Sequence, residues 1–431
     1  MFTERRQRVL EAMGEGAVAI VLGARPAMRT RDEEYPFRQD SDFWYLTGFE
    51  YPFAAAVLRT DGGPPFTLFV QPRDEKAELW TGRRPGIEGA REEYDADEAY
   101  ASDELVTKLP ELLEKAERIY CVLGRDAEVD RKLIEIQENL RGRSKLGLAP
   151  ATQLLDPRNI VHEMRMIKQE AELDIMRRAA DISREAHAEA ARQAQPGRYE
   201  YELEATLECV FRRRGGSGPA YGSIVGGGAN ATVLHYERND QVLRDGELVL
   251  IDAGAELESY ASDVTRTYPV GGRFRGPGRA LYEVVLAAQE TALTACRPGT
   301  TLPEIHRATV RTMVEGMLGV GLLSGTVDDL IAEEAYLPYY MHGTSHWIGL
   351  DVHDVGAYAR GDTHRSLEPG MVFSIEPGIY VAADAENAPA ELRGIGVRIE
   401  DDVVITPDGY ENLNVAIPRH PDDIEAWVRN G

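Results

Sequence analysis

Cysteine is scarce in this 431-residue chain, and long apolar runs are missing from it. The three cysteines, Cys121, Cys209 and Cys296, stand far apart and form no CxxC motif, so we expect neither a disulfide framework nor a thiolate zinc site. Each lies in an apolar stretch, which predicts that all three are buried. No run approaches the 18 apolar residues that a membrane-spanning helix needs.

Positive charge is also in deficit. Lysine and arginine number 48 against 73 aspartates and glutamates, and the net charge of −25 argues against nucleic acid or an anionic membrane as a partner. Residues 1–6 lead into a charged amphipathic helix and not into the apolar segment of a secretion signal. We therefore expect a cytoplasmic protein.

The length of the chain predicts two domains, because 431 residues exceed one ordinary core. Residues 1–160 alternate strand and helix patterns and predict a small α/β domain. Its expected strands and helices cover residues 17–23, 54–59, 66–71 and 118–123, and residues 4–13 and 104–117. This region has no histidine and no acids at metal-ligand spacing, so we expect it to be structural or to limit substrate access.

Residues 161–431 form the second expected domain, and its sequence looks duplicated. After two predicted helices at 168–193 and 200–213, the string Gly-Glu-Leu-Val-Leu-Ile-Asp-Ala-Gly at 246–254 resembles Gly-Met-Val-Phe-Ser-Ile-Glu-Pro-Gly at 370–378. Pro196-Gly197 likewise corresponds to Pro298-Gly299, each pair lying between two helices. Two like halves of this kind predict a pseudo-two-fold arrangement.

Carboxylates occupy places in these halves where charge is costly. Asp252 ends the apolar run 248–251, Glu376 follows 372–375, and Glu400 follows 395–399. A buried carboxylate costs several kcal/mol unless it is paired or binds a cation. Asp263 follows Asp252 on what we expect to be a hairpin, with Thr265 and Thr267 on the same polar, half-open face. An ordinary solvent-facing hairpin is the alternative.

Histidines gather at residues 342–353, where His342, His346 and His353 account for three of the nine in the chain. A lone histidine is usually a core residue, but three together with four acids favour a site. No Glu follows His342, so the HExxH helix of zinc proteases is excluded. Gly343 and Gly349 predict loop and strand. The run 226–228 of three glycines lacks the lysine of a phosphate loop, and we interpret it as a flexible turn.

A donor set of several oxygens and one nitrogen suits hard divalent cations. Mn²⁺ fits best, and Co²⁺, Fe²⁺ or Zn²⁺ are also compatible. Two cations about 3.5–4 Å apart would hold a bridging hydroxide at neutral pH, a nucleophile for a carbonyl or phosphoryl centre. The sequence therefore predicts a metallohydrolase.

Five of these residues, in their order and spacing, resemble the metal ligands of the pita-bread metallopeptidases: Asp252, Asp263, His346, Glu376 and Glu400. That family includes methionine aminopeptidase, prolidase and aminopeptidase P. The string Phe-Arg-Gln-Asp-Ser-Asp-Phe-Trp-Tyr-Leu-Thr-Gly-Phe at 37–49 is similar to the N-terminal domain of aminopeptidase P, which methionine aminopeptidases lack. Residues 342–354 and 396–401 are also similar to the aminopeptidase P pattern.

The resemblance implies a fold and a set of roles. Residues 1–160 would form an α/β domain of the creatinase and aminopeptidase P type, and residues 161–431 an α+β pita-bread catalytic domain with a pseudo-two-fold internal repeat. Asp263 and Glu400 would bridge two metals, Asp252 would complete one site, and His346 and Glu376 the other. Glu376 would also take a proton from the bridging water. The remaining implied catalytic residues are His353, which would donate to the scissile carbonyl, and His235, His342, Tyr380 and Arg398.

Substrate contacts are implied in the same way. His235 would contact the proline side, Arg398 the peptide carboxyl end, and Tyr221 and Trp80 are further candidates. The competing interpretations are a structural salt bridge for Arg398, strand packing for Tyr380 and a plain exposed aromatic for Trp80. The expected function is removal of the N-terminal residue from peptides with proline in second position, by a dimer or tetramer. A prolidase that cuts only X-Pro dipeptides and a non-catalytic binding module are the alternatives.

Overall fold

The computed structural model describes residues 1–429, which form two compact units that divide between Arg165 and Met166. The sequence predicted the division at 160/161, and the structure places it five residues later because the helix Arg158–Met166 belongs almost wholly to the first unit. Among the described residues, no helix combines the length and apolar character needed to cross a membrane.

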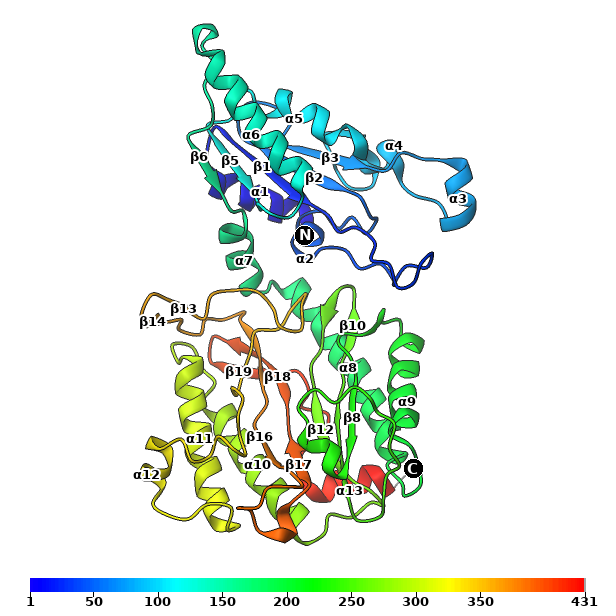
Figure 1. Cartoon of the computed structure of the whole chain (residues 1–431), viewed down its shortest axis with the longest axis vertical. Helices are drawn as coiled ribbons and strands as arrows, with labels where there is room; N and C mark the ends of the chain where they lie inside the picture. The colour runs from blue at the N-terminus through cyan, green and yellow to red at the C-terminus, as the bar shows by residue number, and fades with distance from the viewer. Residues whose placement is uncertain (430–431) are drawn as a thin grey trace. The chain divides into compact units, whose positions relative to one another are not determined.

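The first unit is built on a six-stranded sheet with the order β4-β3-β2-β1-β5-β6 (Figure 1). Its strands are β1 (Ala17–Leu22), β2 (Ala55–Arg59), β3 (Phe66–Val70), β4 (Glu98–Ala101), β5 (Arg118–Cys121) and β6 (Gln153–Leu155). Its helices are α1 (Phe2–Met13), α2 (Ser41–Thr47), α3 (Glu75–Thr81), α4 (Gly86–Glu92), α5 (Leu105–Leu113), α6 (Ala127–Gly142) and α7 (Arg158–Met166). Only β2 runs antiparallel to its neighbours.

The core of this unit explains its apolar strands. β1 reads Ala-Val-Ala-Ile-Val-Leu and is buried along nearly its whole length, as expected of a central strand covered on both faces. Val18, Ile20 and Ile119 pack with Leu109 of α5 and Leu133 of α6. The predicted α/β domain is confirmed.

The second unit contains two sets of helices and strands in the same order. The first set is α8 (Glu170–Arg192), α9 (Glu200–Arg213), β7 (Gly218–Pro219), β8 (Ile224–Gly227), β9 (Leu248–Asp252), β10 (Ala255–Leu257), β11 (Tyr260–Ala261) and β12 (Thr265–Pro269). The second is α10 (Gly276–Ala295), α11 (Leu302–Gly319), α12 (Val327–Ala332), β13 (Ala359–Arg360), β14 (Thr363–His364), β15 (Val372–Ile375), β16 (Gly378–Val381), β17 (Ile395–Arg398), β18 (Asp401–Thr406) and β19 (Gly409–Asn412). Helix α13 (Pro421–Arg429) follows.

Strand pairing follows one pattern in both sets. β9 pairs antiparallel with β12 and the excursion between them pairs β10 with β11; β15 pairs antiparallel with β18 and the excursion between them pairs β16 with β17. The helices α8 and α9 pack together, as do α10 and α11, and Figure 1 shows the two pairs on opposite sides of the strands. The internal repeat predicted from the sequence is therefore present.

The Pro-Gly pairs mark corresponding places in this repeat. Gly197 has φ +87° and its N–H donates to Leu243 O at 2.9 Å; Gly299 has φ +85° and donates to Leu367 O at 2.8 Å. Both need the left-handed backbone that glycine adopts without strain. In each case a glutamate of the next helix, Glu202 or Glu304, caps the backbone N–H three residues before it.

Two local predictions were wrong. Cys209 is exposed on α9, whereas Cys121 and Cys296 are buried as expected. Gly226 and Gly227 are not a turn but the end of strand β8, paired with Leu250 and Val249, and a short 3₁₀ helix begins at Gly228. The glycines allow close packing there, because a β-carbon on Gly226 would lie 2.9 Å from the backbone of Ala231.

Candidate active site

The first half brings two acids together at strand ends. Asp252 is the last residue of β9, and Asp263 lies two residues before β12, whose Thr265 is the register partner of Asp252. Gly254 permits this approach, because a β-carbon there would stand 1.7 Å from Ser262 O. Any larger residue at 254 would push the two acidic segments apart.

The second half repeats the arrangement. Glu376 follows β15, and Glu400 lies between β17 and β18. In each half one acid therefore stands where the first strand ends, and the other stands just before the returning strand begins. Asp252 and Glu400 are buried.

Hydrogen bonds between the halves hold the acids near each other. Glu400 N–H donates to Thr265 O at 3.0 Å, and Thr265 Oγ1 donates to Glu400 Oε2 at 2.7 Å. Thr267 Oγ1 donates to Arg398 O at 3.1 Å. The predicted half-open face was wrong, because Thr265 and Thr267 are fully buried and face the other half of the domain.

His346 completes the group from a loop beside β15. Its N–H donates to Ser374 Oγ at 3.0 Å, and Ser374 N–H donates to His346 O at 2.9 Å. No strand forms between 341 and 358, where only an isolated bridge pairs Trp347 with Phe373, so the strand expected there was wrong. A buried ion pair between Lys168 and Asp354, 3.0 Å long, holds the far end of the loop.

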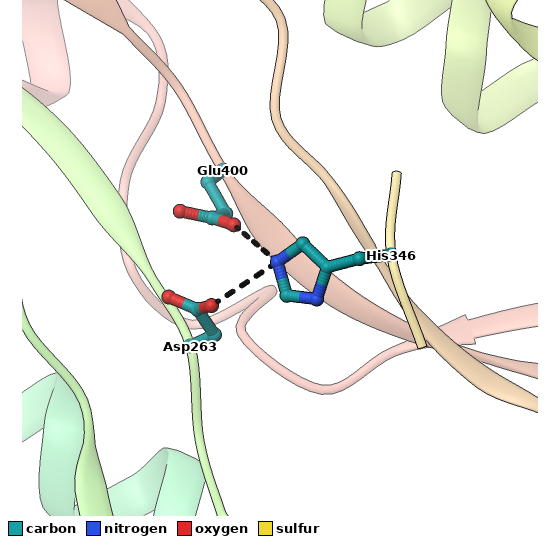
Figure 2. A group of neighbouring side chains, drawn as sticks. All are labelled: Asp263, His346 and Glu400. Carbon is teal, nitrogen blue, oxygen red and sulfur yellow. Dashed lines mark ion pairs between the residues drawn. The ribbon is translucent and has the colours of Figure 1, made fainter. Parts of the chain in front are cut away.

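The imidazole points into the acids, as Figure 2 shows for Asp263 and Glu400. His346 Nε2 lies 3.4 Å from Asp263 Oδ2, 3.6 Å from Glu376 Oε1 and 4.0 Å from Glu400 Oε1. One donor atom from each of Asp263, His346 and Glu400 falls within 4.8 Å of the others. These separations exceed a hydrogen bond and match ligands placed about 2.1 Å around a shared cation.

The chemistry of these donors also fits a divalent cation. His346 Nδ1 lies 3.1 Å from Trp347 O, and a proton on Nδ1 leaves Nε2 as a lone-pair donor toward the acids. The oxygen-rich remainder of the set suits hard cations. Residues present here would thus hold the metal that the sequence predicts.

Burial raises the pKa values of the clustered acids. It raises the pKa of Asp252 despite the nearby Arg398, and that of Glu376 to about 7 despite His346. The pKa of Glu400 is raised well above its ordinary value by burial and then by Asp263. Burial lowers the pKa of His346, but Asp263 and Glu376 outweigh it and leave the value raised to about 9. Mutual repulsion of this kind is relieved when cations lie between the carboxylates.

A second set of side chains supports the acids. Tyr221 OH lies 2.6 Å from both Asp252 Oδ1 and Asp263 Oδ1. Arg398 Nη2 donates to Asp252 Oδ2 at 2.5 Å and Nη1 to Tyr380 OH at 3.0 Å. Tyr380 OH in turn meets His342 Nε2 at 2.9 Å. The salt-bridge interpretation of Arg398 therefore describes its observed contacts, and Tyr380 is packed but also hydrogen-bonded.

A cavity of about 380 Å³ opens over these groups. It is lined by ten of the predicted site residues: Tyr221, His235, Asp252, Asp263, His342, His346, His353, Glu376, Arg398 and Glu400. The ring of His353 lies 4.3 Å from that of His346, centroid to centroid. Tyr380 is buried behind the lining, and Trp80 is an exposed residue of α3 in the other unit.

Sequence reasoning missed several residues of the cavity and its support. Ile224, Leu234 and Val352 give the cavity apolar walls, and Glu237 adds an acid. Asp402 Oδ2 accepts from Asp263 N–H at 2.8 Å and is fully buried. The run Glu400-Asp401-Asp402 between Ile399 and Val403 is the signal that would have revealed it, since three acids in an apolar strand rarely all face water.

Comparison with known proteins agrees with this geometry. Residues 174–407 match the model of metallopeptidase family M24, and residues 2–120 match that of the aminopeptidase P N-terminal domain. The chain belongs to metallopeptidase family M24. This confirms the resemblance to the pita-bread metallopeptidases and their fold, and with it the prediction of a divalent-metal enzyme.

Relatives of this M24 chain match it along nearly its whole length. It is 45% identical to the Xaa-Pro aminopeptidase of Escherichia coli K12, covering 99% of this chain and 97% of that protein. It is 35% identical to human Xaa-Pro aminopeptidase 3, covering 96% and 82%. The solved structure of the aminopeptidase PepP of Pseudomonas aeruginosa matches with a TM-score of 0.96 at 44% identity, covering 100% of this chain and 97% of that one.

Proposed function

We propose that this protein is a metal-dependent aminopeptidase that hydrolyses the bond between an N-terminal residue and a following proline. The observation that carries the proposal is the convergence of four carboxylates and His346 at the floor of one cavity. The names of its full-length relatives, Xaa-Pro aminopeptidases, give the substrate class. Water adds to the scissile carbonyl carbon, the C–N bond breaks, and the proline nitrogen leaves with a proton.

The metal ligands in this proposal are Asp252, Asp263, His346, Glu376 and Glu400. Asp263 and Glu400 would help hold both cations, Asp252 would help hold one, and His346 and Glu376 would help hold the other. When bound, such cations activate water at neutral pH and polarise the substrate carbonyl. Mn²⁺ is the proposed native metal, because four of the five proposed ligand groups donate oxygen and none donates sulfur.

Other residues of the cavity move protons and orient the substrate. Glu376 would accept a proton at its carboxylate from the attacking water, as a ligand carboxylate beside that water can. His353, exposed at the cavity, donates to the carbonyl oxygen as negative charge develops on it. His342 is held by Tyr380 and by Gly343 O, and burial lowers its pKa to about 4, so it stays neutral and faces the substrate as a fixed dipole.

Proline recognition is assigned to the apolar part of the cavity. Ile224, Leu234 and Val352 offer a surface for the pyrrolidine ring, with His235 beside it. An X-Pro bond has no N–H to donate. A site that binds the proline ring through apolar contacts therefore suits it better than one that hydrogen-bonds an extended peptide backbone. Arg398, Tyr221 and Trp80 stay predicted substrate contacts, and a dimer or tetramer stays the predicted assembly.

Two substrates separate this function from a prolidase. The experiment compares Leu-Pro with Leu-Pro-Gly in the presence of Mn²⁺, following release of free leucine. Cleavage of the tripeptide is expected; cleavage of the dipeptide alone would assign a prolidase. Metal retained after dialysis with no hydrolysis of either peptide would instead assign a binding module. Repeating the assay with Co²⁺, Fe²⁺ and Zn²⁺ tests the choice of Mn²⁺, which should give the highest kcat/KM.

A further inference from the structure

One carboxylate of the cavity has no part in the proposed chemistry. Five acids line the cavity, and four of them are the proposed ligands Asp252, Asp263, Glu376 and Glu400. The fifth is Glu237, which is exposed. No hydrogen bond or ion pair joins its side chain to another residue within positions 1–429. The adjacent Arg238 pairs with Asp240 instead, Nε to Oδ2 at 2.5 Å.

The backbone that carries Glu237 is fixed on both sides. Tyr236 OH donates to Glu200 Oε2 at 2.9 Å. Asn239 is fully buried with φ +48°; its Oδ1 accepts from Val225 N–H at 2.9 Å and its Nδ2 donates to Ser223 O at 2.8 Å. The backbone that carries the Glu237 carboxylate is therefore held on both sides and is not part of a loose loop.

Glu237 lines the same cavity as the clustered acids and lies against Gly222. Its side chain crosses Gly222 so closely that a β-carbon on Gly222 would lie 2.7 Å from Glu237 Oε1. The preceding residue, Tyr221, touches both Asp252 and Asp263. The unpaired carboxylate thus lines the same cavity as the acids, beside the segment that carries Tyr221.

Substrate geometry decides which positive charge can reach it. In an N-terminal residue the amino nitrogen lies only about 2.5 Å from the carbonyl carbon, so the α-ammonium stays at the centre when that carbon is attacked. The side chain of the same residue extends outward. With two divalent cations balancing the four ligand acids and Arg398 paired to Asp252, Glu237 is the acid left to face it.

We propose that Glu237 is a specificity-determining residue that favours lysine or arginine as the first residue of the peptide. The inference rests on the proposed function, because it assigns the side-chain subsite of that reaction. An ion pair at a partly exposed site contributes modestly, so the expected preference is a few-fold.

The test compares kcat/KM for Arg-Pro-Gly, Leu-Pro-Gly and Glu-Pro-Gly in the Mn²⁺-loaded parent and in Glu237→Gln. The ratio of Arg-Pro-Gly to Leu-Pro-Gly is expected to fall about two- to five-fold in the variant, with Leu-Pro-Gly turnover preserved. In Glu237→Lys, Glu-Pro-Gly is expected to gain over Leu-Pro-Gly. Asp408→Asn, which removes an exposed acid outside the cavity lining, should leave every ratio unchanged.

Each failure has a separate meaning. A parent that cleaves none of the three peptides overturns the proposed function. A parent that cleaves all three, with ratios unaltered in both Glu237 variants, overturns the role of Glu237 alone. Equal losses on all three peptides would place Glu237 against the α-ammonium and also reject the inference. Leu-Pro-Arg and Leu-Pro-Gly serve as a matched pair that differs only in the third residue. If the Glu237 variants change the ratio of kcat/KM between these two peptides, Glu237 contacts the third residue, and the inference is rejected.

Discussion

Arg266 and Asp401 form an ion pair directly behind the acids of the site, with Arg266 Nη2 and Asp401 Oδ1 2.6 Å apart and both side chains fully buried. Arg266 uses all five of its N–H groups. Besides Asp401 they reach the carbonyl oxygens of Thr265, Glu400, Ile417 and Pro418. Asp401 is the neighbour of Glu400, so this pair joins the first half of the domain to strand β18, which directly follows this proposed ligand.

Removing Arg266 alone should lower the free energy of unfolding more than replacing both charged residues of this pair. Arg266→Met leaves Asp401 ionised and buried beside Gln289 and Asn412, and we expect the free energy of unfolding to fall by about 3–5 kcal/mol. Adding Asp401→Asn removes the buried charge, which Arg419 alone would then pair at 3.6 Å, and should recover part of the loss. Urea unfolding in the presence of a chelator measures both without a contribution from bound metal. Equal losses in the single and double variants would show that the charge is not the cause.

Asp263→Asn tests the metal centre directly. The amide keeps the volume of the side chain but lacks the negative charge between the cations, so we expect metal content to drop and kcat/KM to fall more than about 100-fold. Folding should survive, because the change also removes repulsion with Glu400. Metal analysis after dialysis, the tripeptide assay and near-UV circular dichroism are the measurements. Parent activity in this variant would refute the bridging role.

Tyr221→Phe distinguishes support of the acids from contact with the substrate. The phenol touches Asp252 and Asp263 at 2.6 Å, so its loss should weaken metal binding by about 10-fold through misplacement of those ligands. At saturating metal, KM should then match that of the parent. Calorimetric titration of the metal-free protein gives the metal Kd, and steady-state assays at high Mn²⁺ give KM. A raised KM with unaltered metal affinity would assign Tyr221 to the substrate instead.

The ligand acids could be predicted from sequence because they interrupt apolar strands. Asp252 and Glu376 each end such a run, and Gly254 and Gly378 follow them in like places. The burial of Arg266 could not be predicted, since its alternation with Thr265 and Thr267 is the usual pattern of a strand with one solvent-exposed face. Its burial depends on Asp401, 135 positions away. The same long-range packing hid the contact of Glu237 with Gly222, which depends on how one loop lies across another.

Acid should destabilise the protein partly through His187. This histidine is fully buried, with Nε2 2.9 Å from Ala253 O and Nδ1 3.0 Å from Tyr268 OH, and burial lowers its pKa from 6.5 to about 4. The unfolded chain therefore binds a proton more readily between those values. The contribution of neutral His187 to the free energy of unfolding is therefore complete above pH 6.5. It falls by about 3 kcal/mol as the pH falls toward 4.

The measurement is the free energy of unfolding of the chelated protein at several pH values from 7.5 to 4, in the parent and in His187→Gln. The variant is expected to be less stable at pH 7.5, where it loses a packed hydrogen-bonded ring, and to decline less steeply with acid. Because all other titratable groups of the chain are common to both proteins, the difference between the two curves gives the contribution of His187 to the pH dependence. His364→Gln, an exposed histidine on β14, is the matched control and should parallel the parent. Parallel curves for His187→Gln would mean that His187 takes no part in the acid response.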